Sequence, residues 1–424
     1  MLQRSSPVRI LCFALIGLCL SWLTSCGAQA PQEDALEFWT MQLKPEFTEY
    51  VTGVIDTFEA DNPENPVRWE DVPWNAMETK ILTAVSAQTA PDVVNLNPKF
   101  ASQLATRNAW LDLNGAVTPD DRSVYLPKIW EAGMLGEESF GVPWYLTTQI
   151  TVYNQELLAA AGIEEPPATY AELATVAQAV KEKTGKYAFF VTFVPEDSGE
   201  VLESFVKMGV TLVDEAGQAA FDTPAGRAAF QYWVDLYAQD LLPPEVLTQG
   251  HRYAIDLYQA GETAVLATSA QFLGAIETNA PAVAKVSAAA PQITGETGKK
   301  NVAVMNLVIP RTSDRPEAAV QFALFVTNSD NQLAFAQAAK VLPSTQEALQ
   351  QYIAFLKGKP DPTPVEIAVT VGAEQLADAE VLIPPMEKLN LLQKAIYENL
   401  QGAMLGQKTV EAAVQDAAAQ FNAG

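Results

Sequence analysis

Apolar and polar residues alternate along the chain with two periods, one typical of strands and the other of helices. Residues 35–40 form a short run with apolar residues at alternating positions, which predicts a strand. After Pro45 the spacing becomes helical, and the apolar face consists of Phe47, Val51, Val54, Ile55 and Phe58. Residues 67–72 and 91–96 predict two more strands, separated by a helix over 75–88. This alternation predicts an α/β layer with a mostly parallel sheet.

The alternation resumes after residue 141 and continues to the C-terminus. Three further strands are expected, over 150–153, 187–193 and 302–309. Thr169 and Glu172 have the spacing of a capping box at a helix start, and Thr223-Pro224 predicts a second helix start. The alanine-rich tail over 384–422 is expected to be helical. No repeat recurs at a period of about 20 to 50 residues, which argues against a solenoid.

Residues 1–25 have the pattern of a cleaved export signal. Arginines precede an apolar run over 10–22, which as a helix would rise about 18 Å, short of the roughly 30 Å core of a bilayer. The following Leu23-Thr24-Ser25-Cys26 resembles a bacterial lipobox, which implies cleavage before Cys26 and acylation of its sulfur. Residues 26–35 are then expected to form a flexible tether. We therefore predict an exported protein, lipid-anchored at the periplasmic or extracytoplasmic face of a membrane.

Composition excludes several classes of function. With 49% hydrophobic and 18% charged residues, the chain is typical of a folded protein. Its 26 basic and 51 acidic residues give a net charge of −25, which repels nucleic acid. One histidine, His251, and three cysteines are too few for most metal clusters, so no metal or other cofactor is expected. No nucleophile elbow, phosphate-binding loop or zinc-protease motif occurs, although a glycosidase with two carboxylates stays open.

Aromatic and amide residues gather where the predicted strands end. They occupy four segments, 39–42, 72–75, 95–97 and 143–149. In open α/β sheets, ligands bind beyond the carboxyl ends of the strands. Aromatic rings can stack on the apolar face of a sugar, while amides and hydroxyls can bond its hydroxyl groups. Each tryptophan could instead pack in the core of a lobe or between the lobes. Such packing is favoured for Trp74 and Trp233, whereas ligand contact is favoured for Trp39 and Trp144.

Several ordered segments resemble the extracellular solute-binding proteins of ABC sugar importers, the group that includes maltose-binding protein. The segments are 36–39, 72–74 with 89–94, 141–145 with 152–157, 221–226, and 261–265 with 342–344. The resemblance implies a two-lobed α/β periplasmic-binding-protein fold of type II, with hinge strands joining the lobes around a ligand cleft. Lobe I would comprise 36–145 and 296–340, and lobe II 146–295 and 341–424. The resemblance also implies that the protein is a monomer, is not an enzyme, and delivers its ligand to a membrane permease that works with a cytoplasmic ATPase.

By position, the resemblance places a set of polar and aromatic residues around that cleft. The expected ligand-binding residues are Trp39, Thr40, Gln42, Asn95, Asn97, Trp144, Tyr145, Thr147, Ser269, Gln271, Phe272 and Asn306. Relatives often carry Gly-Pro-Trp where this chain has Ser269-Ala270-Gln271, and fewer stacking rings suggest a small glycoside, disaccharide or short oligosaccharide. A receptor for glycerol phosphate or another polyol is the main alternative. A secreted glycoside hydrolase and a purely structural lipoprotein stay open as rivals.

Overall fold

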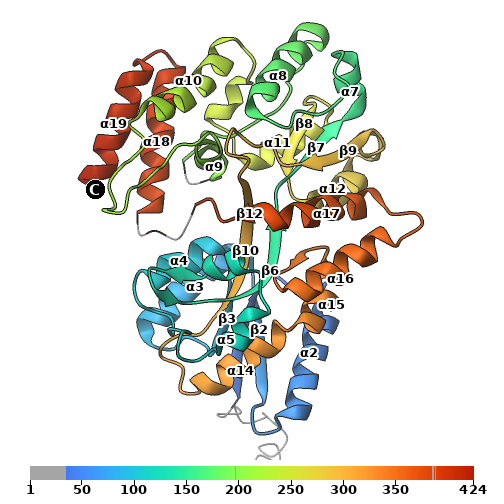
Figure 1. Ribbon diagram of the computed structural model, residues 1–424, viewed down its shortest axis with the longest axis vertical. Coiled ribbons are helices and arrows are strands. Elements are labelled where there is room, and N and C mark those ends of the chain that lie inside the picture. Colours follow the sequence, from blue (N-terminus) through green and yellow to red (C-terminus); the bar gives the residue numbers. More distant parts are fainter. Residues whose placement is uncertain (1–34, 196, 384–385, 387) are drawn as a thin grey trace, which may run out of the picture.

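The computed structural model describes residues 35–195, 197–383, 386 and 388–424, without the side chains of Pro98, Lys99 and Ser102. The predicted export signal, Cys26 and nearly all of the tether lie outside the described residues. Figure 1 shows an elongated molecule of two lobes, one above the other. We call the lobe that contains the N-terminal strand lobe I and the other lobe II. The predicted two-lobed α/β architecture is therefore confirmed.

Lobe I is built on one mixed sheet. Its strands are β1 (Leu36–Met41), β2 (Val67–Val72), β3 (Val93–Leu96), β6 (Val142–Thr148), β10 (Lys300–Val308) and β11 (Leu342–Pro343), in the order β11-β6-β10-β3-β1-β2. The short β12 (Ala379–Glu380) also pairs with β10. The expectation of a mostly parallel sheet is wrong, because β10 runs antiparallel to both β3 and β6. The strands β6 and β10 connect the lobes, β6 leading into lobe II and β10 returning from it, so they run antiparallel.

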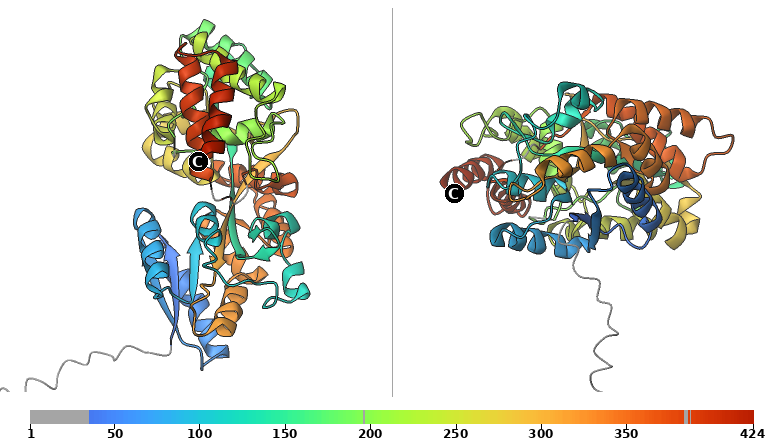
Figure 2. Two further views of the ribbon diagram at one scale, coloured as in Figure 1. Left: turned by 90° about the vertical axis from the view of Figure 1, so that its left-hand side faces the viewer. Right: turned by 90° about the horizontal axis from the view of Figure 1, so that it is seen from below.

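Helices cover both faces of this sheet (Figure 2). The main ones are α2 (Thr48–Asp61), α3 (Trp74–Ala87), α4 (Pro98–Ala105), α5 (Pro119–Ser123), α6 (Pro127–Glu131), α14 (Pro316–Val326), α15 (Ser329–Ala339) and α16 (Gln346–Lys357). The predicted apolar face of α2 is confirmed, since Val51, Val54, Ile55 and Phe58 are buried. Phe58 packs edge-on against Phe322 of α14, with ring centroids 4.9 Å apart. A small hairpin of β4 (Met134–Leu135) and β5 (Glu138–Ser139) completes the lobe.

Lobe II combines a small antiparallel sheet with a helical shell. The sheet order is β8 (Val265–Thr268), β7 (Ile150–Asn154) and β9 (Ser287–Pro291). The helices are α7 (Gln155–Ala160), α8 (Tyr170–Thr184), α9 (Glu200–Lys207), α10 (Pro224–Ala238), α11 (His251–Gln259), α12 (Ala270–Asn279), α13 (Pro281–Ala284), α17 (Pro364–Glu374), α18 (Leu389–Met404) and α19 (Val410–Ala423). The last two confirm the helical tail.

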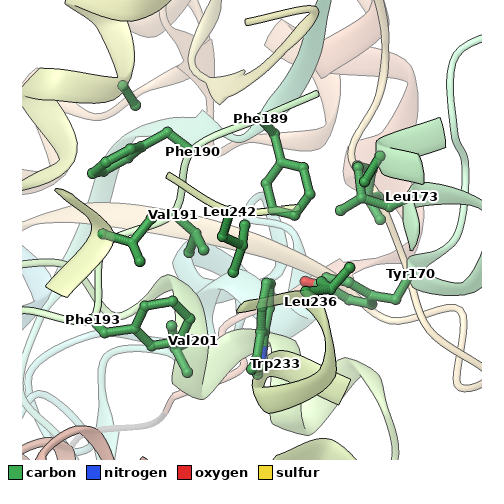
Figure 3. Packing of buried hydrophobic residues seen from close by; sticks show 14 of the residues in the cluster. Tyr170, Leu173, Phe189, Phe190, Val191, Phe193, Val201, Trp233, Leu236 and Leu242 are labelled. Carbon is green, nitrogen blue, oxygen red and sulfur yellow. The ribbon is translucent and has the colours of Figure 1, made fainter. Parts of the chain in front are cut away.

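The centre of the lobe II core is aromatic (Figure 3). Trp233 of α10 contacts Tyr170, Phe189 and Phe193, each ring edge-on to the indole. Phe189 and Phe193 belong to 187–193, where a strand was predicted. That prediction is wrong, because the segment is buried but makes only an isolated bridge at Tyr187 instead of a ladder. The apolar residues of 187–193 therefore reflect burial in the core and not a strand.

The chain passes between the lobes at three places. The first crossing joins β6 to β7 through Gln149, and the second runs from the end of β9 to the start of β10. The helix α16 packs against α15 of lobe I, whereas α17 packs against β9 and α12 of lobe II. Since α17 also contacts α16, the chain passes to lobe II between these two helices, later in the sequence than the expected boundary at 340. The lobe boundaries at 145, 295 and 340 stay a prediction. Among the described residues, no helix combines the length and apolarity needed to cross a bilayer.

Candidate functional site

The carboxyl ends of three parallel strands meet at the edge of lobe I that faces lobe II (Figures 1 and 2). The strands β1, β2 and β3 end there at Met41, Val72 and Leu96. β1 lies between the other two, so the three ends are neighbours. A ligand held between the lobes would meet this edge, as in other open α/β sheets.

The turn after β1 is held by the carboxylate of Asp71. Its Oδ1 accepts hydrogen bonds from the Thr40 hydroxyl at 2.6 Å and the Leu43 amide at 2.8 Å. Its Oδ2 accepts from the Lys44 amide at 2.9 Å. Thr40 is fully buried, and its hydroxyl also accepts from the Trp69 indole at 2.7 Å. Thr40 thus supports the turn that carries Gln42.

Gln42 and Trp74 form the exposed part of this edge. Gln42 adopts a left-handed backbone with φ of 54° and is exposed. Its side-chain oxygen accepts a hydrogen bond from the backbone amide of Trp74 at 3.2 Å, linking the ends of β1 and β2. Trp74 opens α3 and is 46% exposed. Sequence reasoning favoured packing for Trp74, although its position after Pro73 at a strand end was the available signal.

Two of the predicted tryptophans lie in the core of lobe I. Trp39 is 7% exposed, and the Lys80 ammonium covers its ring at 3.8 Å from the centroid. Trp144 is buried and stacks on Phe335, with centroids 5.2 Å apart and planes inclined by 20°. In this conformation neither ring offers a broad face to a ligand. Their role in binding stays a prediction.

Three asparagines lie near the ends of β3 and β10. Asn95 and Asn306 are buried, and the Asn95 side-chain amide donates to the Asn306 backbone oxygen at 3.4 Å. Within the described part of the chain, the side-chain oxygens of both have no hydrogen-bond partner. Asn97 is half-buried, and its oxygen accepts from the Phe100 amide at 2.8 Å, so it orients the first turn of α4.

A small pocket between the lobes collects three more of the predicted residues. Thr147 of β6, Ser269 and Gln271 line it, together with Lys340 of lobe I, and its volume is about 20 Å³. The Gln271 side-chain amide donates to the Ala339 backbone oxygen at 3.5 Å, which joins α12 to the end of α15. Phe272, the next residue, is 39% exposed. Both lobes therefore contribute polar groups to this pocket.

Tyr145 lies beside the buried aromatic group of lobe I. It is half-buried and packs edge-on against Trp144 and Phe335 at 5.2 Å each. Burial raises the pKa of its phenol, and the nearby Asp71 carboxylate adds to the shift. The hydroxyl therefore stays protonated at neutral pH and can act as a hydrogen-bond donor.

A cluster of charged groups on α9 was missed by sequence reasoning. Burial raises the pKa of Glu200 to about 8, and neighbouring Glu203 adds to the shift while Lys207 opposes it. Burial also lowers the pKa of Lys207, which is fully enclosed. The His251 imidazole lies 3.9 Å from Glu200, and burial lowers its pKa. The spacing of Glu200, Glu203 and Lys207 can be seen in the sequence. Among 51 acidic residues, however, it could not be told from a chance arrangement.

The described residues contain no group of three or more histidine, cysteine or acidic side chains arranged to hold a metal ion. The groups at the interlobe edge include an indole, a phenyl ring, amides and hydroxyls, and Lys340 lines the small pocket beside them. Such groups can stack on a ligand and exchange hydrogen bonds with it. These rings, amides and hydroxyls suit reversible binding of a hydroxyl-rich molecule.

Comparisons with known proteins agree with this geometry. A solved structure of a putative oligosaccharide periplasmic-binding protein from Synechococcus sp. MITs9220 is 46% identical, with a TM-score of 0.85, and covers 92% of this chain and 98% of its own. The cyclic alpha-maltosyl-1,6-maltose binding protein of Arthrobacter globiformis has the same fold at 21% identity and a TM-score of 0.79, over 92% and 98% of the two chains. The diacetylchitobiose binding protein DasA of Streptomyces coelicolor is 24% identical over 92% of this chain and 89% of its own.

A family model described as bacterial extracellular solute-binding protein matches residues 44–333, well over half of the chain. Members of this family are substrate-binding proteins of ABC transporters and not enzymes, so the glycoside hydrolase hypothesis is set aside. The chain belongs to the bacterial extracellular solute-binding protein family.

Proposed function

We propose that this protein is the lipid-anchored receptor of an ABC sugar importer. It captures a small glycoside, disaccharide or short oligosaccharide between its lobes and delivers it to a membrane permease driven by a cytoplasmic ATPase. One observation carries the proposal. Each lobe presents an exposed aromatic ring beside amide or hydroxyl groups near the interlobe surface, Trp74 with Gln42 in lobe I and Phe272 with Ser269 in lobe II.

The relatives support a carbohydrate as the ligand. The names of the similar proteins refer to an oligosaccharide, a cyclic maltose derivative and diacetylchitobiose. These ligands differ in size and linkage, but all combine apolar ring faces with many hydroxyl groups. Indole and phenyl rings suit the first feature, and side-chain amides that both donate and accept suit the second.

We divide the predicted site by exposure. Direct contact with the ligand is assigned to the exposed and half-buried residues, namely Gln42, Asn97, Tyr145, Thr147, Ser269, Gln271 and Phe272, to which the structure adds Trp74. Trp39, Thr40, Asn95, Trp144 and Asn306 are buried and are assigned a supporting role. A ligand bound by the exposed residues of lobe I and of lobe II would favour a closed arrangement of the lobes, because only then do both lobes touch it.

The anchor and the partner complete the proposal. Acylation of Cys26 would hold a monomer at the extracytoplasmic membrane surface, within reach of its permease. Replacing Cys26 by serine should abolish incorporation of labelled fatty acid and release the protein into the soluble fraction. Retention of the Cys26→Ser variant in the membrane would contradict the anchor and leave the binding function untouched.

The binding site itself is tested by titrating tryptophan fluorescence with disaccharides and trisaccharides. Trp74→Ala and Phe272→Ala should each weaken binding by roughly 2- to 12-fold, since an aromatic contact is worth roughly 0.5–1.5 kcal/mol beyond its buried area. Val124→Ala is the matched control, because Val124 is an exposed apolar residue of lobe I at 44% exposure, outside this edge. Unchanged affinity in both aromatic variants would refute this placement of the site.

A further inference from the structure

The buried side chain of Gln375 contacts the first and second crossings between the lobes. Gln375 itself lies in the segment that follows the third crossing. Gln375 opens a short 3-10 helix (Gln375–Asp378) directly after α17 and is 3% exposed. Its side-chain nitrogen donates to the Thr148 hydroxyl at 3.1 Å and to the Gln149 backbone oxygen at 2.8 Å, both in the first crossing. Its side-chain oxygen accepts from the Gln292 backbone amide at 3.2 Å, in the second crossing.

These partners fix the orientation of the Gln375 amide group. A backbone carbonyl can only accept and a backbone N–H can only donate, so nitrogen and oxygen cannot exchange places. Both protons of the side-chain nitrogen and one lone pair of the oxygen are used. The backbone groups of Gln149 and Gln292 are thereby held on opposite ends of a single planar amide.

Gln292 extends the same network to the start of β10. Its side-chain oxygen accepts from the Asn301 backbone amide at 2.7 Å, and its nitrogen donates to the Asn301 oxygen at 3.0 Å. The same nitrogen lies 3.5 Å from the Gln149 oxygen. Gln292 is 2% exposed, so water cannot readily replace these bonds. Both ends of the second crossing, at 292 and 301, are therefore linked to the first.

Close packing of α17 supports this arrangement. A side chain at Gly372 would approach the Thr148 hydroxyl to 3.0 Å, and that hydroxyl donates to the Gly372 backbone oxygen at 3.4 Å. Beyond Gln375, β12 pairs with Lys300 and Asn301 of β10. The segment over 372–380 thus lies against both crossings and is joined to each by hydrogen bonds.

We propose that Gln375 is a positioning residue that couples the crossings into one hinge, so that the lobes move about a single axis. The proposal rests on the proposed function only in that a receptor which closes on its ligand needs a defined hinge. Without the Gln375 amide, the first two crossings would keep the strand pairings that flank them, β6 with β10 and β7 with β9, and the long Gln292–Gln149 contact. They would lose the shorter bonds that join them between those pairings, so the backbone angles there would be less restricted. The lobes would then sample a wider range of relative orientations, and fewer molecules would hold the arrangement that binds ligand.

The test measures the distance between the lobes by pulsed electron paramagnetic resonance, without any ligand. All cysteines of the sequence, Cys12, Cys19 and Cys26, are replaced by serine in the full chain, and labels are attached to exposed positions Thr79 on α3 and Ala275 on α12 after substitution by cysteine. Gln375→Met keeps the size and removes the hydrogen bonds, and Gln375→Glu keeps the acceptor but loses the donor. Gln351→Ala on α16 is the control, because Gln351 is exposed and its side-chain amide donates to Glu347 within its own helix.

Both Gln375 variants should broaden the distance distribution, whereas Gln351→Ala should leave it unchanged. Circular dichroism must show that each variant is folded, and hydrogen exchange at the Gln292 amide provides a second measurement. That amide should exchange at least tenfold faster in Gln375→Met, because it loses its acceptor. An unchanged distance distribution in folded Gln375→Met that shows faster exchange at the Gln292 amide would overturn the proposal. Since no ligand is present, a wrong sugar assignment cannot produce that result.

Discussion

Replacing Trp233 by alanine should strongly destabilise lobe II. Trp233 is 2% exposed, and its ring lies within 5.0 to 6.3 Å of Tyr170, Phe189, Phe193 and Tyr232, measured between centroids. Its indole nitrogen donates to the Ser204 hydroxyl at 3.1 Å. Deleting a buried aromatic side chain of this size costs about 3–5 kcal/mol of unfolding free energy, because the surrounding core cannot fill the cavity.

The expected size can be expressed as a shift in melting temperature. For a unit of about 150–250 residues, each kcal/mol corresponds to roughly 2–4 °C, so Trp233→Ala should lower the midpoint by about 6–20 °C. Differential scanning calorimetry provides the measurement. Trp74→Ala is the matched control, since its ring is 46% exposed and should change the midpoint by about 1–2 °C at most. Equal shifts in the two variants would refute the division of these tryptophans into core and surface.

Three further predictions concern particular contacts. Gly226→Ala should destabilise the start of α10, because the added carbon would lie 1.8 Å from the Phe221 backbone oxygen, and thermal melting should show the loss. Asp71→Ala should lower the unfolding free energy by about 1–3 kcal/mol in urea titrations, since it leaves a buried Thr40 hydroxyl and two backbone amides without their acceptor. Burial raises the pKa of Glu200 from 4.5 to about 8, so the folded chain holds this proton more tightly and loses stability as the pH rises from about 5 to 8. Glu200→Gln should reduce that loss in melts across this range, and an unchanged pH profile would contradict it.

Local signals in the sequence predicted local structure well. Thr223-Pro224 starts α10 as expected, with the Thr223 hydroxyl accepting from the Gly226 amide at 3.1 Å. The capping box of Thr169 and Glu172 is present at the start of α8. Such motifs depend on hydrogen bonds within one turn, so neighbouring residues contain the information. The order of segments was also enough to identify the family and its two-lobed fold.

Long-range relations were beyond the sequence. Trp74 and Trp233 both lie in helices beside apolar residues, and only the assembled lobes show that one is exposed and the other buried. Gln292 and Gln375 are 83 residues apart, and no periodic pattern links two glutamines that meet at a crossing. The direction of β10 in the sheet likewise depends on how the chain returns from lobe II. These features arise from tertiary packing, which propensity and periodicity do not encode.

We propose above that this protein binds a carbohydrate between its lobes. The most direct measurement is thermal unfolding of the protein against a panel of mono-, di- and trisaccharides, glycosides, polyols and polyol phosphates. A ligand present at 100 times its dissociation constant should stabilise the folded state by about 2.7 kcal/mol. We predict such a shift with at least one glycoside or oligosaccharide, and a smaller shift in Trp74→Ala at the same ligand concentration. A shift with glycerol phosphate or another polyol phosphate alone would contradict the sugar assignment and identify the alternative receptor.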